Sequence, residues 1–215
     1  MIIFEMVAAL VLAYCLGSIP FGLLLSRFWG TTDIRQYGSG KTGATNVLRT
    51  AGKKAAVMVV ILDVSKGALA VVFADLLVGS GSLGVAGFNL DITSIKVLAG
   101  LAAIAGHIWP VFYKFHGGRG VATFFGGLMV ISPVAVILGG EALIIVVALT
   151  RFASLGSIVA MVVVYATMVA LHIFNGFPMT YIFYAMFGGI TVILVHRDNI
   201  RRLLQGTERR LGEKI

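Results

Sequence analysis

Residues Gly120–Leu149 read GVATFFGGLMVISPVAVILGGEALIIVVAL, and this stretch decides how often the chain crosses a membrane. One unbroken helix of these 30 residues would be about 45 Å long, well beyond a hydrocarbon core of about 30 Å. Proline disfavours helix at the preceding residue and is well placed to begin a new helix, so Ser132-Pro133 predicts a break. We therefore expect a short helix over 120–131 and a second helix, running the opposite way, over 134–149.

The composition of the whole chain is that of an integral-membrane protein. Its 215 residues are 59% hydrophobic and only 12% charged, with a mean hydropathy of +0.99. This predicts a single membrane domain covering 1–215. Further apolar segments are expected at about 4–28, 55–78, 96–113, 152–173 and 179–195. Together with the two helices above, they predict an all-α bundle of about seven segments, one of them short.

The basic residues predict how this bundle is oriented. Fifteen of the 17 Lys and Arg fall at ends or loops on one side of the seven-segment arrangement, and only Lys66 and Lys96 do not. By the positive-inside rule, that side is cytoplasmic, with the N-terminus outside and the C-terminus inside. A single span over 120–149 would instead place Arg151 and the basic C-terminal tail outside.

The stretch Gly38–Gly43, GSGKTG, looks like a nucleotide-binding loop, but its setting argues against that function. A P-loop needs glycine five positions before Gly40, where Arg35 stands, and it follows a strand rather than a membrane helix. Its glycines and small hydroxyl residues can still expose backbone N–H groups to an anion, with Arg49 close by. The alternative is a flexible basic loop held against anionic lipid headgroups.

A second loop, Lys114–Thr123, carries three glycines around Arg119 just before an apolar helix. Glycine there costs helix stability, which indicates a close approach of the backbone to another group. A guanidinium offers a planar fork to phosphate oxygens, so phosphate is the natural guest. The alternative is a helix-breaking turn with an interfacial arginine. Two such loops on one membrane face indicate two anionic groups.

The remaining polar residues support weaker predictions. His196, Asn199 and Leu203 share a helical face, so a polar pair could face the two loops, although a basic tail more often only stops transfer. Asp63 and Lys66, three residues apart in the second span, are expected to pair, for structural or functional reasons. Glu141 has no evident partner in the sequence. His107 is expected to pack or hydrogen-bond rather than to act as a base.

The motifs of these loops resemble those of a known family, and they occur in its order along the chain. They are Gly17–Gly22, Asp33–Arg35, Gly38–Gly40, Gly43–Arg49, Gly106-His107, Pro110–Phe112, Gly117–Thr123, Arg151-Phe152, Ser154-Leu155, His196-Arg197, Asn199-Ile200 and Gly206–Glu208. On these residues the chain resembles the bacterial acyl-phosphate:glycerol-3-phosphate acyltransferase (PlsY) family from its first helix to its tail.

The resemblance implies an enzyme of phospholipid synthesis. Such an enzyme moves a fatty acyl group from acyl phosphate to the 1-hydroxyl of glycerol 3-phosphate, giving lysophosphatidate and phosphate. It also implies a multi-pass protein of the bacterial cell (inner) membrane, surrounded by membrane lipids and with its site facing the cytoplasm. Because the mixed anhydride is already activated, positioning and electrostatic stabilisation could suffice. We expect no cofactor, no metal and no nucleic-acid partner.

The resemblance also assigns roles to individual residues. Ser39 and Arg49 are implied to be catalytic, with Arg49 clamping a phosphate and Ser39 hydrogen-bonding the substrates. The residues implied to bind substrate are Gly38, Gly40, Thr45, Asn46, Gly117, Gly118, Arg119, Gly120, His196 and Asn199.

The chain departs from the family pattern at two places. The family usually has Asn and an aliphatic residue where Lys41-Thr42 stand, and Lys where His116 and Arg119 stand. Arg119 keeps the positive charge but changes a point donor to a fork. The strongest rival function is a small membrane anion transporter, which charged loops, broken helices and Glu141 would also suit.

Overall fold

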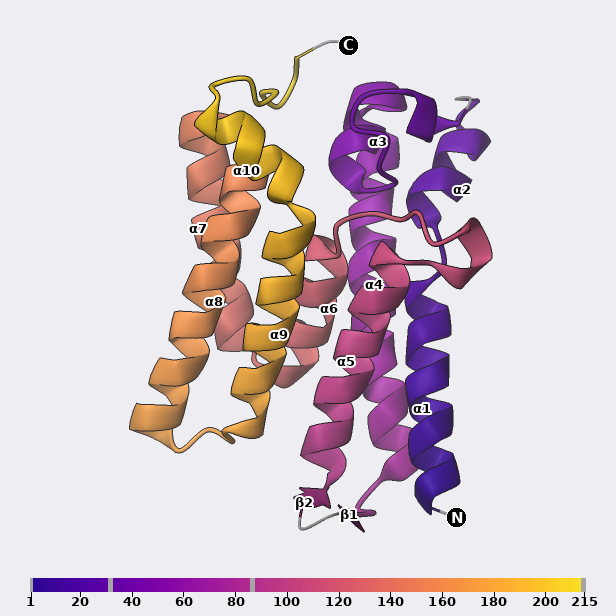
Figure 1. The fold of residues 1–215 in the computed structure, drawn as a ribbon, viewed down its shortest axis with the longest axis vertical. Helices are drawn as coiled ribbons and strands as arrows, with labels where there is room; N and C mark the ends of the chain where they lie inside the picture. The colour runs from indigo at the N-terminus through magenta and orange to yellow at the C-terminus, as the bar shows by residue number, and fades with distance from the viewer. Residues whose placement is uncertain (1, 31–32, 86–87, 214–215) are drawn as a thin grey trace.

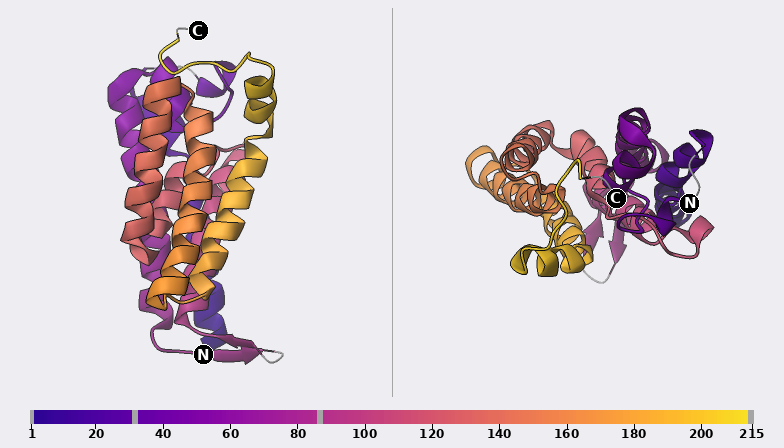
Figure 2. Two further views of the ribbon diagram at one scale, coloured as in Figure 1. Left: turned by 90° about the vertical axis from the view of Figure 1, so that its left-hand side faces the viewer. Right: turned by 90° about the horizontal axis from the view of Figure 1, so that it is seen from above.

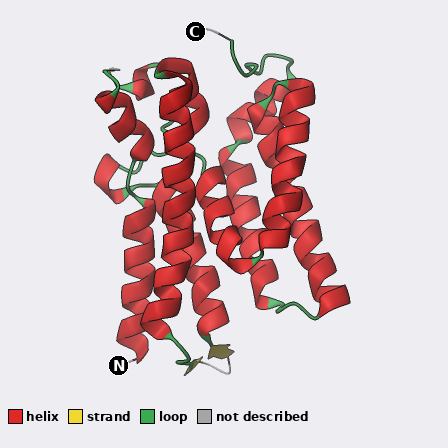
Figure 3. Cartoon of the chain, turned by 180° about the vertical axis from the view of Figure 1, so that it is seen from behind, coloured by secondary structure: helices red, strands yellow, loops and turns green. Residues whose placement is uncertain are grey.

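The computed structural model describes residues 2–30, 33–85 and 88–213, and nearly all of the ordered elements in these ranges are helices (Figure 3). In chain order the elements are α1 (Ile2–Gly17), α2 (Phe21–Phe28), η1 (Ile34–Gln36), α3 (Ala44–Thr50), α4 (Gly52–Val78), β1 (Leu83–Val85), β2 (Phe88–Leu90), α5 (Ile92–Ile108), η2 (Val111–Tyr113), α6 (Val121–Ile131), α7 (Pro133–Thr150), α8 (Ala153–Asn175), α9 (Thr180–Val195) and α10 (Arg197–Leu204). Lys214, one of the fifteen basic residues counted above, lies outside the described residues.

The helices form two groups, with the short helix α6 between them (Figures 1 and 2). One group holds α1 to α5 and the other holds α7, α8 and α9. The groups are joined where α6 packs along α4 and where α5 packs against α9. The N- and C-termini lie at opposite ends of the bundle (Figure 1), and we call the end with the C-terminus the C-terminal end.

The number of apolar segments agrees with the prediction. Among the described residues, five helical stretches are long and apolar enough to cross a membrane, and a sixth results if α9 and α10, bent by 60° at their junction, count as one span. The short apolar helix α6 completes the seven. The all-helical membrane fold is thereby confirmed, whereas the side of the membrane that each end faces stays a prediction.

The predicted break at Ser132-Pro133 is present. Helix α6 ends at Ile131 and α7 begins at Pro133. The Ser132 hydroxyl caps the new helix by accepting a hydrogen bond from the Ala135 amide at 3.4 Å. Proline fits the first helical position because its missing N–H would have had no partner there.

The predicted first apolar segment is present as one candidate span, Ile2–Phe28, but it contains a break that was not predicted. It divides into α1 and α2 around Pro20, which precedes the first residue of α2. Because proline has no N–H, it cannot continue the hydrogen-bond ladder of α1. The carbonyl of Ile19 at this break instead accepts a hydrogen bond from Lys66 Nζ at 3.0 Å. Pro20, like Pro133, indicates a break between two helices, but no break was predicted from the sequence at Pro20.

The end opposite the C-terminus carries a small hairpin that the sequence did not reveal. Strands β1 and β2 pair antiparallel, with Leu83 opposite Leu90. The helix that follows begins at Ile92 rather than near Lys96, because Asp91 caps it by accepting a hydrogen bond from the Ser94 amide at 2.9 Å. Lys96 forms an ion pair with Asp75 at 2.9 Å, which accounts for one of the two basic residues outside the positive face.

Small residues let the central helices approach closely. A Cβ added to Gly67 of α4 would overlap the carbonyl of Thr123 on α6, and one added to Gly126 of α6 would overlap the carbonyl of Val64 on α4. Membrane helices associate by packing rather than by a hydrophobic driving force, so such backbone contact stabilises the pair. On the other side of α6, Phe124 stacks on Tyr184 of α9 with ring centroids 5.2 Å apart.

Candidate active site

Asn46 organises the first predicted loop. Its side chain is buried, and Nδ2 lies within hydrogen-bond distance of three backbone carbonyls, those of Ile34 (2.9 Å), Tyr37 (3.2 Å) and Lys41 (2.9 Å). Its Oδ1 accepts a hydrogen bond from the Ser39 amide at 3.1 Å. One amide group thus fixes the loop that precedes α3, in addition to lining the cleft described below.

Ser39 and Arg49 lie on this loop and on the helix that follows it. Ser39 is flanked by Gly38 and Gly40, whose φ angles of 61° and 67° fall in the left-handed region that favours glycine. Arg49, on α3, donates a long hydrogen bond from Nη2 to the Arg209 carbonyl at 3.4 Å. Its buried Nε has no partner among the described residues. Burial, reinforced by the nearby Arg209 charge, lowers the pKa of the Arg49 guanidinium.

The second loop is fastened to the end of α5. The amide of Gly117 donates to the Ile108 carbonyl and that of Gly118 to the His107 carbonyl, each at 3.1 Å. Gly120, with φ 81°, precedes the first residue of α6. Arg119 therefore projects from a loop that is held on one side by α5 and on the other side by α6.

Arg119 brings a buried guanidinium nitrogen, Nε, into the site, and this atom has no hydrogen-bond partner within the described ranges. Removal from water lowers the pKa of the guanidinium to about 10, so it remains charged at neutral pH. A partly buried cation without an acceptor is costly, and an anionic ligand would supply the missing acceptor.

The C-terminal tail is tied to the site through Glu208. Its carboxylate accepts hydrogen bonds from Ser154 Oγ (2.8 Å), Asn199 Nδ2 (2.6 Å) and Arg202 Nε (2.7 Å). Burial alone would raise the pKa of Glu208, but these three donors outweigh it and lower the pKa below its usual value. Sequence reasoning quoted Glu208 within a motif without giving it a role. In the sequence, Glu208 stands out as a carboxylate between basic residues.

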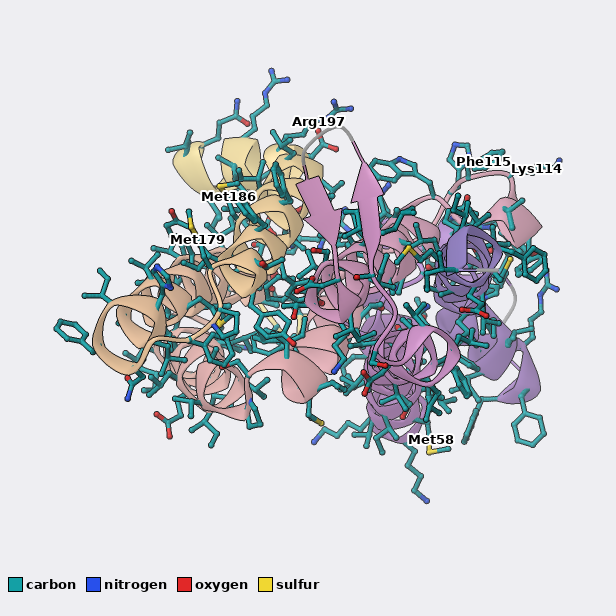
Figure 4. The ribbon with its side chains drawn as sticks, turned by 90° about the horizontal axis from the view of Figure 1, so that it is seen from below. Met58, Lys114, Phe115, Met179, Met186 and Arg197 are labelled. Atoms are coloured by element: carbon teal, nitrogen blue, oxygen red, sulfur yellow. The ribbon has the colours of Figure 1, made fainter. Side chains whose placement is uncertain are left out.

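His196 is buried at the junction of α9 and α10. Its Nδ1 lies 2.7 Å from the Val192 carbonyl, which can only accept, so Nδ1 carries the hydrogen of the neutral ring. The other ring nitrogen, Nε2, is then left as an acceptor, and the side chain lines the cleft. His196 and Asn199 are both buried, and they line the larger and the smaller lobe respectively, while Arg197 lies at the outer edge of the bundle (Figure 4).

These residues meet in a cleft with two connected lobes. The larger lobe has a volume of about 450 Å³ and extends between α4, α6, α7 and α8, where Val60, Phe125 and Leu143 are among its apolar walls. The smaller lobe has a volume of about 170 Å³ and lies under the C-terminal tail. Ser39 and Arg119 line both lobes, so the two lobes form one site.

Most predicted site residues face this cleft. Those that line it are Gly38, Ser39, Thr45, Asn46, Arg49, Arg119, Gly120, His196 and Asn199. Gly40, Gly117 and Gly118 line neither lobe. The structure gives Gly117 and Gly118 a packing role against α5, and a direct role of these three glycines in binding substrate stays a prediction. Ser154, Asp198, Arg202 and Arg209 line the smaller lobe and were not predicted.

The two departures from the family pattern differ in their relation to the cleft. Lys41 lines both lobes, so its charge adds to the site. His116 is exposed, with Nδ1 2.5 Å from the Lys114 carbonyl. The neighbouring Lys114 and Phe115 lie at the periphery of the bundle, away from α7, α8 and α9 (Figure 4). The described residues contain no group of three or more His, Cys, Asp or Glu placed to bind a metal ion.

Comparison with known proteins gives consistent results. A family described as glycerol-3-phosphate acyltransferase matches residues 7–206. The chain is 55% identical over 214 residues to glycerol-3-phosphate acyltransferase 3 of Dehalococcoides mccartyi, covering all of this chain and 99% of that protein. It is 40% identical over 202 residues to glycerol-3-phosphate acyltransferase of Halalkalibacterium halodurans, covering 94% of this chain and 93% of that protein.

Two crystal structures have a similar fold. Both are of PlsY (YgiH), an integral membrane glycerol 3-phosphate acyltransferase. The glycerol 3-phosphate form superposes with a TM-score of 0.84 at 35% identity, over 96% of each chain. The lysophosphatidic acid form superposes with a TM-score of 0.82 at 34% identity, over 96% of this chain and 95% of that one.

We expect Glu208→Gln to lower the thermal unfolding midpoint in detergent at neutral pH, because a neutral amide pairs poorly with Arg202. The folded-state pKa of Glu208 lies below the usual value of about 4.3. The charged carboxylate therefore stabilises the folded protein above that value, and this contribution is lost as the pH falls through the folded-state pKa.

The difference in midpoint between wild type and variant should accordingly be constant from about pH 8 to about pH 5 and shrink below about pH 4. Unfolding curves across this range measure it. Glu213→Gln, which changes an exposed glutamate of the same tail, serves as the matched control. A difference that persists unchanged at about pH 3 would contradict this role of Glu208.

Proposed function

Because the chain belongs to the glycerol-3-phosphate acyltransferase family, we propose that it transfers a fatty acyl group from acyl phosphate to the 1-hydroxyl of glycerol 3-phosphate. It is a multi-pass membrane acyltransferase, so the anion-transporter alternative is set aside. The observation that carries the proposal is one cleft that joins an apolar lobe to a polar lobe lined by four arginines, two of which, Arg49 and Arg119, have a buried Nε without a partner in the described residues. Such a cleft suits two substrates that both carry a phosphate group, one of which also carries an acyl chain.

The two arginines are suited to hold the two phosphates. Arg49 and Arg119 each have a buried Nε without a protein partner, and both line the smaller lobe. A phosphate oxygen would satisfy such a donor and neutralise the charge. We assign one phosphate to each guanidinium, with Ser39 between the lobes as a hydroxyl that can hydrogen-bond either substrate.

The reaction needs little chemistry from the protein itself. The hydroxyl oxygen of glycerol 3-phosphate attacks the acyl carbonyl carbon, and the bond from that carbon to the phosphate oxygen breaks. Phosphate leaves with the bonding electrons, and the hydroxyl proton passes to a phosphate oxygen. Fixed guanidinium groups lower the barrier by stabilising negative charge that moves onto the leaving phosphate. His196 Nε2, an acceptor that faces the cleft, helps to orient the hydroxyl.

The larger lobe is the proposed place for the acyl chain. On α7 its lining residues are Gly140, Leu143, Ile144 and Val147, which form one stripe of that helix. Ile144 and the opposing Val60 of α4 are also exposed on the outside of the bundle, 66% and 43% respectively. An acyl chain lying there would contact both protein and lipid. This suits an acyl substrate and an acyl product that both dissolve in the membrane.

We place the site on the cytoplasmic face of a bacterial cell membrane. The loops of the site lie at the C-terminal end of the bundle, where the described basic residues other than Lys66 and Lys96 are concentrated. The positive-inside rule assigns that end to the cytoplasm. The water-soluble acceptor would then enter from the cytoplasm while the acyl donor arrives from the membrane.

An assay with purified protein in detergent tests the reaction directly. Acyl phosphate and labelled glycerol 3-phosphate should give lysophosphatidate and one equivalent of phosphate, while acyl-CoA should give no product because it lacks the leaving phosphate that the two guanidinium groups are proposed to stabilise. Product from acyl-CoA at a similar rate would refute the donor assignment. A folded protein without product from acyl phosphate would refute the reaction, and uptake of label into sealed vesicles without acylation would restore the transporter alternative.

Substitution of the two arginines tests their roles. Arg49→Ala should lower kcat by about 100-fold or more, the loss typical when one transition-state donor is removed. Arg119→Lys should keep substantial turnover if charge alone matters and lose most of it if the guanidinium fork is required. Lys54→Ala, at an exposed cation of α4, is the matched control. Near-normal turnover of a folded Arg49→Ala protein would remove Arg49 from the site.

The position of the acyl chain can be tested at Gly140. A Cβ added there meets no atom within 4 Å, so a larger side chain would extend into the lobe without a clash. Gly140→Leu should therefore reduce kcat/KM for long-chain relative to short-chain acyl phosphates by about 10-fold, the scale of one or two methylenes in an apolar pocket. Ala148→Leu, on an exposed face of α7, should leave the ratio unchanged. An unchanged ratio in Gly140→Leu would place the chain elsewhere.

A further inference from the structure

Four buried polar side chains inside the bundle have no role in the proposed reaction, although two of them, Asp63 and His107, line the larger lobe. Asp63, Lys66, His107 and Thr123 are 2%, 3%, 7% and 0% exposed, and we call them the buried polar cluster. Groups of this kind are expensive inside a membrane and are seldom present without a task. Their contacts connect four separate parts of the fold, namely the break between α1 and α2, helix α4, the end of α5 and the start of α6.

The cluster is anchored at Lys66. Its Nζ lies 2.9 Å from Asp63 Oδ1 and donates to the Ile19 carbonyl at the break between α1 and α2. The paired charges can remain ionised away from water because each faces a strong partner. The sequence predicted this pair, and the structure shows that it also holds the carboxylate of Asp63 toward α5.

His107 is the next member of the chain of contacts. Its Nδ1 lies 3.5 Å from Asp63 Oδ1 and 3.2 Å from Thr123 Oγ1. A carboxylate can only accept, so the ring nitrogen that faces Asp63 carries a hydrogen. The ring orientation of His107 is therefore fixed from α4 and α6 at once.

His107 contacts the chain on both sides of Arg119. Before Arg119, the His107 carbonyl accepts the Gly118 amide at 3.1 Å, and a Cβ on Gly118 would overlap His107 Nε2. After Arg119, Thr123 in the first turn of α6 contacts His107 Nδ1. The buried polar cluster thus fixes both flanks of the one loop residue that projects its charge into the cleft.

Arg119 depends on this support because no hydrogen bond from a described residue fixes the buried Nε of its own side chain. We propose that His107, held by Asp63, is a positioning residue that sets where the Arg119 guanidinium meets the phosphate of glycerol 3-phosphate. This inference rests on the proposed function and goes beyond it by giving the membrane-embedded charges a role in affinity for the acceptor.

The geometry assigns His107 a positioning role and not a catalytic one. Its Nε2 is covered by Gly118, and its Nδ1 is directed at Asp63 and Thr123. His107 lines the larger lobe beside the proposed acyl chain, but it does not line the smaller lobe, where Arg49 and Arg119 are proposed to hold the phosphates.

The close fit between His107 and Gly118 allows a size-exchange experiment. Gly118→Ala adds a methyl group where Nε2 lies, and His107→Asn removes that edge of the ring while keeping an amide donor near Asp63. Misplacement of a binding group by about 1 Å can cost about 100-fold. Each single variant should therefore raise KM for glycerol 3-phosphate by about 10- to 100-fold, with KM for acyl phosphate changed by less than about 2-fold.

The double variant should recover part of the loss, because the added methyl group occupies the space that the shortened side chain leaves. Such non-additivity is expected of residues in direct contact and not of independent damage. His172→Asn is the matched control and should leave both KM values unchanged. His172 lies near the end of α8 that is opposite to Ser154. Thermal unfolding midpoints of wild type and of the four variants, measured in the same detergent, separate a local displacement from a loss of folding.

The outcomes are distinct. Wild-type protein that does not acylate glycerol 3-phosphate would overturn both the proposed function and this inference. Active wild type with folded single variants whose KM for glycerol 3-phosphate is unchanged would overturn this inference alone. An equal rise in both KM values, or additive effects in the double variant, would also overturn it. If His107→Asn does not fold, Gly118→Ala by itself decides through the same two KM values.

Discussion

The length of α6 is the constraint on which the site depends. This helix has 11 residues, so it spans only about 16 Å and cannot cross a hydrocarbon core of about 30 Å. The loop before it must therefore enter the bundle rather than remain at its surface (Figure 1). Because backbone groups at that depth need partners, the loop amides of Gly117 and Gly118 are satisfied by the carbonyls at the end of α5. A deep loop places Arg119 beside the apolar lobe.

The treatment of charge divides the interior into two regions. Asp63 and Lys66 are paired, with Asp63 at the wall of the larger lobe, and Glu208 is satisfied by three donors that hold the tail in place. Arg49 and Arg119 keep buried nitrogens that the protein does not satisfy. Unpaired charge raises the free energy of the empty site, and binding of anionic substrates removes that cost. The residues that stabilise the fold and those that await ligand are therefore different sets.

Sequence reasoning succeeded where a single residue has a strong local effect. The break at Ser132-Pro133 and the pairing of Asp63 with Lys66 are both of this kind. It failed at Pro20, where an equally strong signal lay inside an apolar run that was long enough for one span. It also failed for Glu208, whose three donors come from α8 and α10 and have no common pattern in the sequence.

The sequence by itself determined the number of membrane segments, the concentration of positive charge at one end and the family to which the motifs point. These follow from hydropathy, helix length and proline chemistry, all of which act over a few neighbouring residues. Only the tertiary structure decided that Gly117 and Gly118 pack on α5, that Asn46 holds its own loop together, and that one cleft unites Ser39 with Arg119. Such facts depend on which distant backbones touch, and close contacts between residues far apart in the chain leave no periodic trace along it.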